Sequence, residues 1–180
     1  MTDQRTISIF GATGSVGLST LDLVRQHRDK DRVLALTANG NAVDLAKLAR
    51  EFEPEVAVVA DQSAYPALKE ALAGTATKAA AGDAALVEAA QMGADWTMAA
   101  IVGCAGLPPT MAAIEAGKTV ALANKEALVS AGELMMAAVA RSGATLLPVD
   151  SEHNAIFQCL AGGRIDQVRK QQEVLVQAQE

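Results

Sequence analysis

Short apolar runs alternate with amphipathic stretches along most of this 180-residue chain. The runs have lengths typical of buried strands, and the stretches between them carry apolar residues at helical spacing. We predict strands over residues 6–10, 33–37, 56–60, 96–102, 119–123 and 145–149. We predict helices over residues 15–27, 43–52, 65–73, 84–92, 109–116 and 126–140, with a loosely packed connection at 79–82. This alternation predicts βαβ units and an α/β fold with a parallel sheet.

The composition narrows the classes of partner that the chain can have. Hydrophobic residues make up 51% of the chain and aromatic residues only 3%, so we expect a core of Ala, Val, Leu and Ile. A net charge of −6 argues against binding to nucleic acid, because no basic patch is available to contact phosphates. No apolar run approaches the roughly 20 residues that span a bilayer, and we expect no membrane partner.

The two cysteines and the N-terminus favour a reducing, cytoplasmic location. Cys104 and Cys159 have neither metal-ligand spacing nor the pattern of a disulfide framework, and we expect both to be small, buried packing residues. The first five residues lead directly into a predicted strand without the pattern of a signal peptide.

Three glycines, Gly11, Gly14 and Gly17, lie between the first predicted strand and the first predicted helix. A tight turn at this place brings backbone N–H groups and the helix N-terminus toward a pyrophosphate. The spacing G-x-x-G-x-x-G is a variant of the usual dinucleotide fingerprint. The alternative is a tight strand–helix turn that binds nothing. The position of the three glycines inside a βαβ unit favours nucleotide binding.

The end of the second predicted strand carries Ala38, Asn39, Gly40 and Asn41, without an acidic residue. Domains that bind NAD place Asp or Glu there to bind the ribose 2′-hydroxyl. This segment has no acidic residue that would repel a 2′-phosphate, and it therefore favours NADP. The alternative is an Asn-Gly turn with no ligand.

Two further strand ends carry groups of interest. Residues 99–110 form a loop of small residues, which would let a flat ring approach the backbone or would simply pack as an Ala/Gly turn. Asn124, Lys125 and Glu126 follow the next predicted strand. Lys125 has the charge to meet a substrate oxygen or a phosphate, although a surface charge pair at a helix start is the alternative.

Asp150, Ser151 and Glu152 follow the last predicted strand. Two carboxylates with a hydroxyl between them form half of a hard-oxygen site suited to Mg²⁺ or Mn²⁺. The alternative is a helix start, with Asp150 or Ser151 as the N-cap and Glu152 favoured by the helix dipole.

Taken in order, these motifs resemble the N-terminal part of the 1-deoxy-D-xylulose 5-phosphate reductoisomerase family, whose members use NADPH. The resemblance lies in residues 11–17, 36–41, 99–110, 117–126 and 148–160. It implies a Rossmann-like parallel sheet with flanking helices, forming an NADP-binding domain over residues 1–150. The start of a catalytic domain would follow over 151–170, and residues 171–180 depart from the family pattern.

The resemblance also implies a role for each matching residue. The pyrophosphate would be held by Thr13, Gly14, Ser15 and Val16, and the adenosine ribose with its 2′-phosphate by Ala38, Asn39, Gly40 and Asn41. The nicotinamide half would be held by Asn124 and Glu126. The substrate would be held by Lys125, Ser151 and Glu152, and the metal by Asp150 and Glu152. Lys125 and Glu152 would be the catalytic residues, with Mn²⁺ or Mg²⁺ polarising the substrate carbonyl. Gly40 departs from the family, because many members carry Lys or Arg there, and this predicts a weaker preference for NADP.

The activity implied is the conversion of 1-deoxy-D-xylulose 5-phosphate to 2-C-methyl-D-erythritol 4-phosphate, in non-mevalonate isoprenoid biosynthesis. Members of the family are homodimers with longer chains than this one. We therefore expect an incomplete portion of such an enzyme, with little turnover of the sugar phosphate. The alternative is an NADP(H)-binding domain without catalysis.

Overall fold

The computed structural model describes residues 4–150, 154, 155, 157 and 158. The chain divides into two compact units, Met1–Leu147 and Pro148–Glu180. The first unit contains the strands and helices of the sheet, and the second contains the short helical segment of which four residues are described. Among the described residues, no helix is long and apolar enough to cross a membrane.

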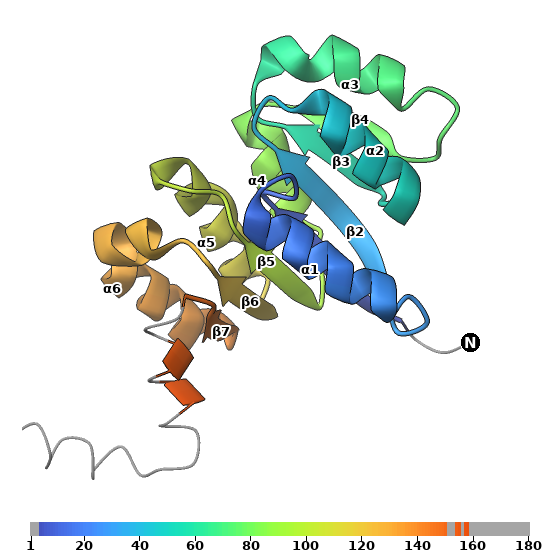
Figure 1. The fold of residues 1–180 in the computed structure, drawn as a ribbon. Helices are drawn as coiled ribbons and strands as arrows, with labels where there is room; N and C mark the ends of the chain where they lie inside the picture. The colour runs from blue at the N-terminus through green and yellow to red at the C-terminus, as the bar shows by residue number, and fades with distance from the viewer. Residues whose placement is uncertain (1–3, 151–153, 156, 159–180) are drawn as a thin grey trace, which may run out of the picture. The chain divides into compact units, whose positions relative to one another are not determined.

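The first unit alternates strands and helices from its beginning to its end (Figure 1). Its first half consists of β1 (Arg5–Phe10), α1 (Ser15–Gln26), β2 (Asp31–Ala38), α2 (Ala42–Phe52), β3 (Val56–Val59), the 3₁₀ turn η1 (Gln62–Ala64), α3 (Tyr65–Ala71) and β4 (Lys78–Ala81). Its second half consists of α4 (Asp83–Gln91), β5 (Trp96–Ala99), the 3₁₀ turn η2 (Cys104–Gly106), α5 (Leu107–Glu115), β6 (Thr119–Leu122) and α6 (Lys125–Ser142). The strand β7 (Thr145–Pro148) ends the series.

The seven strands form one sheet in the order β4-β3-β2-β1-β5-β6-β7. The five pairs from β4 to β6 are all parallel. The strand order runs outward from β1 toward β4 and then restarts on its other side with β5, so the connection from β4 crosses back over the sheet. This is the doubly wound arrangement, and the predicted Rossmann-like fold is confirmed.

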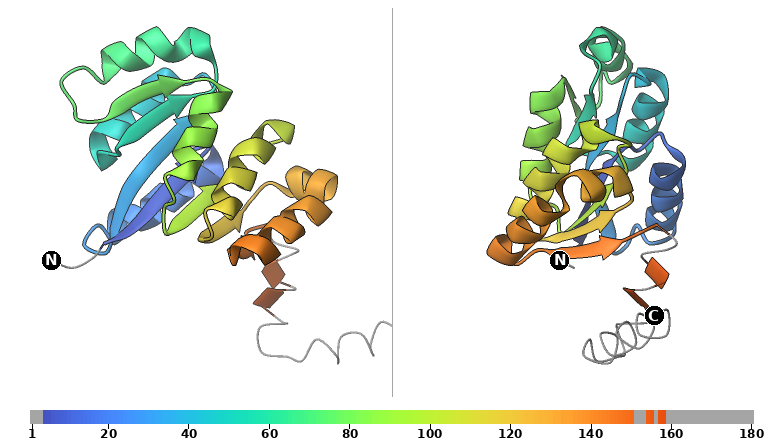
Figure 2. Two further views of the ribbon diagram at one scale, coloured as in Figure 1. Left: turned by 180° about the vertical axis from the view of Figure 1, so that it is seen from behind. Right: turned by 90° about the vertical axis from the view of Figure 1, so that its left-hand side faces the viewer.

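Helices cover both faces of the sheet (Figure 2). In the right-hand view, α1 and α2 lie on one face and α4, α5 and α6 on the other. Helix α3 packs on α2 and on the edge strand β4. With both faces covered, the middle parts of the strands are mostly apolar, as expected for a parallel sheet.

The core is aliphatic, as the composition predicts. Its largest fully buried side chains are aliphatic residues together with Met135, Asn124 and Thr37, and Phe10 is a buried aromatic residue at the end of β1. Helix α1 presents Gly17, Thr20, Leu21 and Val24 to the sheet, at the i, i+3, i+4, i+7 spacing of one helix face.

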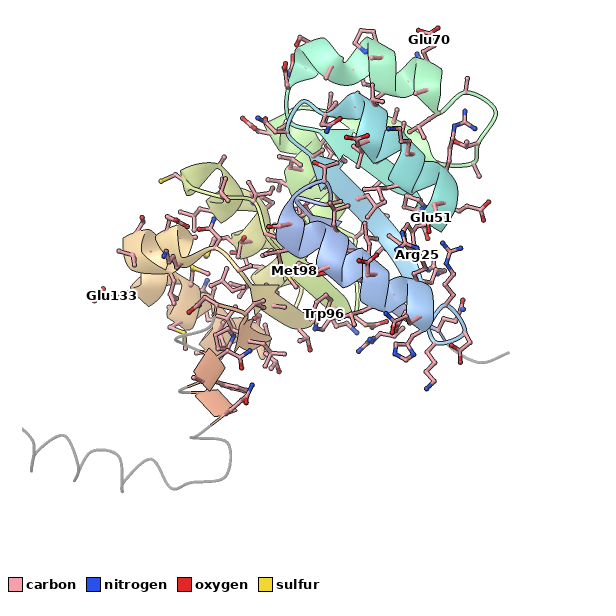
Figure 3. The ribbon with its side chains drawn as sticks, in the orientation of Figure 1. Arg25, Glu51, Glu70, Trp96, Met98 and Glu133 are labelled. Carbon is pink, nitrogen blue, oxygen red and sulfur yellow. The ribbon has the colours of Figure 1, made fainter. Side chains whose placement is uncertain are left out.

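An ion-pair cluster joins the C-terminal ends of α1 and α2. The Arg25 guanidinium donates to both oxygens of Glu51, at 2.6 and 3.0 Å, and these side chains are labelled in Figure 3. Arg25 also pairs with Asp22, and the guanidinium groups of Arg25 and Arg28 lie over the Phe52 ring. The hydrogen bonds from Arg25 hold the pKa of Glu51 below its usual value.

The structure corrects the prediction of a loose connection at residues 79–82. Lys78–Ala81 form the edge strand β4, which pairs in parallel with β3 from Val56↔Lys78 to Val59↔Ala81. A run of alanines has little intrinsic preference for strand, so tertiary context decides the outcome here. The hydroxyl of Thr77 donates a 2.7 Å hydrogen bond to the carbonyl oxygen of Pro54 and fixes the start of the strand.

Candidate functional site

The turn between β1 and α1 is packed so closely that side chains are excluded at two positions. Gly11 has a φ of +89°, and a Cβ on it would lie 2.7 Å from the carbonyl oxygen of Ala100. A Cβ on Gly17 would lie 2.3 Å from the carbonyl oxygen of Gly11. Both distances are too short for any other residue. These two glycines therefore bring α1, the turn and the end of β5 together.

The N-terminus of α1 has backbone donors but no side-chain cap. Gly14 is the N-cap residue, and the first turn of the helix carries no acidic residue. The first intrahelical bond runs from the Leu18 N–H to the Gly14 carbonyl oxygen at 2.8 Å. The preceding N–H groups of Ser15, Val16 and Gly17 have no partner within the helix, and with the helix dipole they favour an anion.

The ends of four neighbouring strands meet at this edge of the sheet. The Ala12 N–H donates to Thr37 O at 2.7 Å, and the Ala100 N–H donates to Phe10 O at 2.9 Å. The Ala123 N–H donates to Ala99 O at 3.0 Å. These bonds place the predicted residues 13–16, 38–41 and 124–126 at the carboxyl ends of β1, β2 and β6, at one edge of the sheet. The first two sets lie at the ends of the neighbouring strands β1 and β2, and β5 separates them from the third.

Asn124 is almost completely buried and uses its side chain within the protein. Its amide nitrogen donates to Ile101 O at 2.6 Å and to Gly103 O at 2.8 Å. Its amide oxygen accepts from the Ala127 N–H at 2.9 Å and thereby caps α6. The side chain thus connects the loop after β5 to the start of α6. It also explains why β5 ends at Ala99 and not at residue 102 as predicted, since these carbonyl groups bond to Asn124.

Lys125 and Glu126 occupy the first turn of α6, and both side chains are exposed. Glu126 is an acidic residue at the N-terminal end of a helix, where the dipole favours it. Their position at the carboxyl end of β6 leaves both side chains accessible to a ligand at this edge. The structure is thus compatible with the predicted roles of these residues, which stay predictions.

Asp61 is a residue that the sequence prediction missed. It follows β3, and its N–H donates to Asn39 O at 3.0 Å, which brings it beside the 39–41 loop. A Cβ on Gly40 would lie 3.4 Å from the carboxylate oxygen Oδ2 of Asp61. The sequence prediction considered acids only at the end of the second strand. The signal that would have found Asp61 is the Asp-x-Ser turn at the end of the next strand, which pairs with the second.

In the second unit, Asp150 is half-buried, and its carbonyl oxygen accepts from the Asn154 N–H at 3.0 Å. Asn154 and Ala155 are helical. The other predicted residues of this motif, Ser151 and Glu152, lie outside the described residues. Within the described part of the chain, no group of three His, Cys, Asp or Glu residues is arranged to hold a metal ion.

The prediction that Cys104 is buried is wrong. Cys104 begins the turn η2 and is an exposed, free cysteine, in a loop whose neighbouring residue Val102 is also exposed. The other cysteine, Cys159, lies outside the described residues.

Comparisons with known proteins agree with this geometry. The family model for 1-deoxy-D-xylulose 5-phosphate reductoisomerase matches residues 7–132. The relative of that name from Zymomonas mobilis is 62% identical over 170 residues, covering 94% of this chain. The solved structure of the Zymomonas mobilis reductoisomerase in complex with NADPH superimposes with a TM-score of 0.87 at 64% identity, over 88% of this chain and 42% of that one.

A second solved structure, a DOX-P reductoisomerase in complex with NADPH, fosmidomycin and magnesium, has a TM-score of 0.83 at 46% identity. It matches 87% of this chain and 39% of that chain. The chain spans 44% of the length of the Zymomonas mobilis relative. The similarity therefore covers nearly all of this chain but less than half of each relative.

Proposed function

Because this chain belongs to the 1-deoxy-D-xylulose 5-phosphate reductoisomerase family, we propose that its first unit is the dinucleotide-binding part of such an enzyme and binds NADPH. The observation that carries the proposal is the N-terminus of α1, which offers unpaired backbone donors and no acid directly after the central strand. This is the place where doubly wound domains bind a pyrophosphate.

Each predicted residue has a place in this proposal. Thr13, Gly14, Ser15 and Val16 bind the pyrophosphate through the turn and the first turn of α1. Ala38, Asn39, Gly40 and Asn41 surround the adenosine ribose at the carboxyl end of β2. The nicotinamide then lies toward β5 and β6, where Asn124 fixes the backbone and Glu126 lies in the first turn of α6. The bound cofactor supplies the hydride, and the protein orients it.

The reaction proposed for the whole protein is the conversion of 1-deoxy-D-xylulose 5-phosphate to 2-C-methyl-D-erythritol 4-phosphate. The residues proposed to contact the substrate are Lys125, Ser151 and Glu152. Asp150 and Glu152 are ligands for Mg²⁺ or Mn²⁺, which have the hard-oxygen preference that two carboxylates satisfy. A homodimer and a cytoplasmic location also belong to the proposal for the whole protein.

Two carboxylates do not complete a metal site that takes about six oxygens. The metal is therefore expected to bind weakly to this chain, and replacing Asp150 by Asn should weaken Mn²⁺ binding further. Unchanged Mn²⁺ affinity in Asp150→Asn would remove Asp150 from the ligand set.

The alternative function is binding of NADP(H) without catalysis. It is favoured by the position of every residue proposed to bind the dinucleotide, since all of them lie within the first unit. Mixing the chain with NADPH, Mg²⁺ and 1-deoxy-D-xylulose 5-phosphate separates the two functions. NADPH oxidation at an enzymatic rate supports the complete reaction, whereas binding without oxidation supports the alternative.

Calorimetric titration of the 180-residue chain with NADPH tests the shared part of both functions. The decisive variant is Ser15→Asp, which adds a negative charge to the first turn of α1. The helix dipole favours that charge, so folding is retained, but the charge repels a pyrophosphate. We expect NADPH affinity to fall at least about tenfold, from like-charge repulsion close to the ligand.

The matched control is Ser19→Asp, which adds the same charge one turn further along α1 at an exposed position. Its effect on NADPH binding should be several times smaller. Equal effects of the two substitutions would contradict binding at the N-terminus of α1.

A further inference from the structure

The end of β3 brings a carboxylate to the loop that receives the adenosine ribose. Strands β2 and β3 are parallel, with Ala38 opposite Val59, and the pairing continues beyond both strands. The Ala60 N–H donates to Ala38 O at 2.9 Å, and the Asp61 N–H donates to Asn39 O at 3.0 Å. Asp61 is therefore held by its own backbone beside Asn39 and Gly40.

The two carboxylate oxygens of Asp61 have different surroundings. Oδ1 accepts a 2.8 Å hydrogen bond from the Ser63 N–H and starts the turn η1. Oδ2 lies 3.4 Å from the position of a Cβ on Gly40, so it faces the 39–41 loop. The hydrogen bonds from Ser63 hold the pKa of Asp61 below its usual value, and the side chain is exposed. A full negative charge is thus available to a ligand at this loop near neutral pH.

Lys47, the first cationic residue of α2 after the 39–41 loop, already forms an ion pair with a carboxylate of the same helix. Lys47 donates to Asp44 Oδ1 at 2.7 Å, and Asn41 donates to the other oxygen of Asp44 at 2.9 Å. Gly40, which faces Asp61, has no side chain to offset the carboxylate. The pairing of Lys47 leaves the charge of Asp61 to dominate the Gly40 side of the loop.

From this arrangement we infer that Asp61 determines dinucleotide specificity in this chain and lowers its preference for NADPH over NADH. The inference rests on the proposed binding of a dinucleotide at this edge of the sheet. A carboxylate here accepts a hydrogen bond from the ribose 2′-hydroxyl of NADH and repels the 2′-phosphate of NADPH. In many NAD-binding domains the acid with this function follows the second strand, whereas here it comes from the third.

The test is titration of the 180-residue chain and three variants with NADPH and with NADH. Asp61→Asn removes the charge but keeps an oxygen that can accept from the Ser63 N–H, since Asn and Asp are equivalent as N-caps. The phosphate would lie several ångströms from the carboxylate, and salt screens their repulsion. We therefore expect the ratio of NADPH affinity to NADH affinity to be about 3- to 10-fold higher in Asp61→Asn than in the unchanged chain. Gly40→Arg, which places a cation between Asp61 and the phosphate, should shift the ratio in the same direction.

The matched control is Asp29→Asn, which removes the same charge from an exposed position in the turn before β2, at the opposite end of the sheet. Its NADPH-to-NADH ratio should equal that of the unchanged chain. The same ratio in Asp61→Asn as in Asp29→Asn would overturn the inference and leave the proposed function intact. Failure of every form to bind either dinucleotide would overturn the proposed function and the inference with it.

Discussion

The side chain of Asn124 donates a 2.6 Å hydrogen bond to the carbonyl oxygen of Ile101, 23 residues earlier in the chain. The same amide group also donates to Gly103 and accepts from the Ala127 N–H. The three bonds are 2.6 to 2.9 Å long, and the side chain is nearly inaccessible to solvent. Asn124 therefore acts on a ligand at this edge through the backbone that it positions, and its side chain is not free to bind a ligand directly.

Replacing Asn124 by Asp tests this positioning role. The substituted side chain keeps an oxygen for the Ala127 N–H but points a buried oxygen at two carbonyl groups. We expect the free energy of unfolding to fall by about 2–4 kcal/mol, because the carbonyl oxygens of Ile101 and Gly103 lose their donor and face a buried oxygen. Denaturant unfolding measures this loss. Asn41→Asp is the control, because Asn41 caps α2 at an exposed position, and it should cost less than about 1 kcal/mol. Similar losses in the two variants would contradict the special role of Asn124.

Replacing Gly17 by Ala should damage the turn between β1 and α1. The added methyl group would meet backbone atoms of Gly11 and Ala12, which have no flexible end to move away. We expect a loss of about 3 kcal/mol in the free energy of unfolding and weaker NADPH binding. The control is Gly132→Ala within α6, where a Cβ would meet only the end of Leu128 at 3.9 Å. That variant should be as stable as the unchanged chain or up to about 1 kcal/mol more stable, from helix propensity.

Ser8 and Thr37 are buried hydroxyl residues on neighbouring strands with different surroundings. The Ser8 hydroxyl has no hydrogen-bond partner among the residues that the structure describes, whereas Thr37 Oγ1 accepts from the Gly11 N–H at 3.0 Å. Ser8→Ala should therefore leave stability unchanged or raise it by about 1 kcal/mol. Thr37→Val should cost about 1–3 kcal/mol, because it leaves the Gly11 N–H unpaired. Thermal unfolding of both variants measures the two changes in stability. A larger loss of stability for Ser8→Ala than for Thr37→Val would contradict this prediction.

Asp95 gives part of the stability a defined dependence on pH. Its Oδ2 accepts from the N–H and the hydroxyl of Thr6, at 3.0 and 2.8 Å, and Lys118 lies 3.3 Å from Oδ1. The Thr6 hydrogen bonds, with a smaller contribution from Lys118, lower the pKa of Asp95 in the folded state. A lowered pKa means that this stabilisation is complete above the unfolded pKa of about 3.9 and is lost as pH falls through the lower folded pKa.

The expected result is that Asp95→Asn destabilises the chain more at pH 7 than at pH 3. Free energies of unfolding from denaturant titrations at the two pH values provide the measurement. Asp83→Asn removes an exposed carboxylate in the first turn of α4 and serves as the control. A cost of Asp95→Asn that is the same at both pH values would contradict the contribution of its charge.

The sequence was sufficient to predict the fold wherever local pattern and tertiary context agree. The helix α2 begins after Asn41 and ends before Pro54, as capping and proline rules require. The edge strand β4 was missed because its alanines carry no strand preference, and its pairing depends on the open edge of β3. In helix α1, Leu23 is 61% exposed while Gly17 and Thr20 face the sheet, so the apolar pattern alone does not identify the buried face.

The candidate site was predictable only in part, for a similar reason. The glycine turn and the 38–41 loop are continuous segments, and their spacing identified them. Asp61 and Asn124 act on parts of the chain about 20 residues away, through strand pairing that a motif does not describe. For Asn124, the position at the end of a strand was recognised, but its burial and its bonds to the loop after β5 required the structure.

The position of β1 at the centre of the sheet has a consequence for watching the protein fold. The chain has a single tryptophan, Trp96, which lies opposite Ile7 in the pairing of β5 with β1 (Figure 3). Thr6 and Asp95, the neighbouring pair, are 89 residues apart, so this pairing closes a long loop and belongs among the slow contacts to form. The intrinsic fluorescence of Trp96 therefore reports the step of folding at which the two halves of the sheet pair.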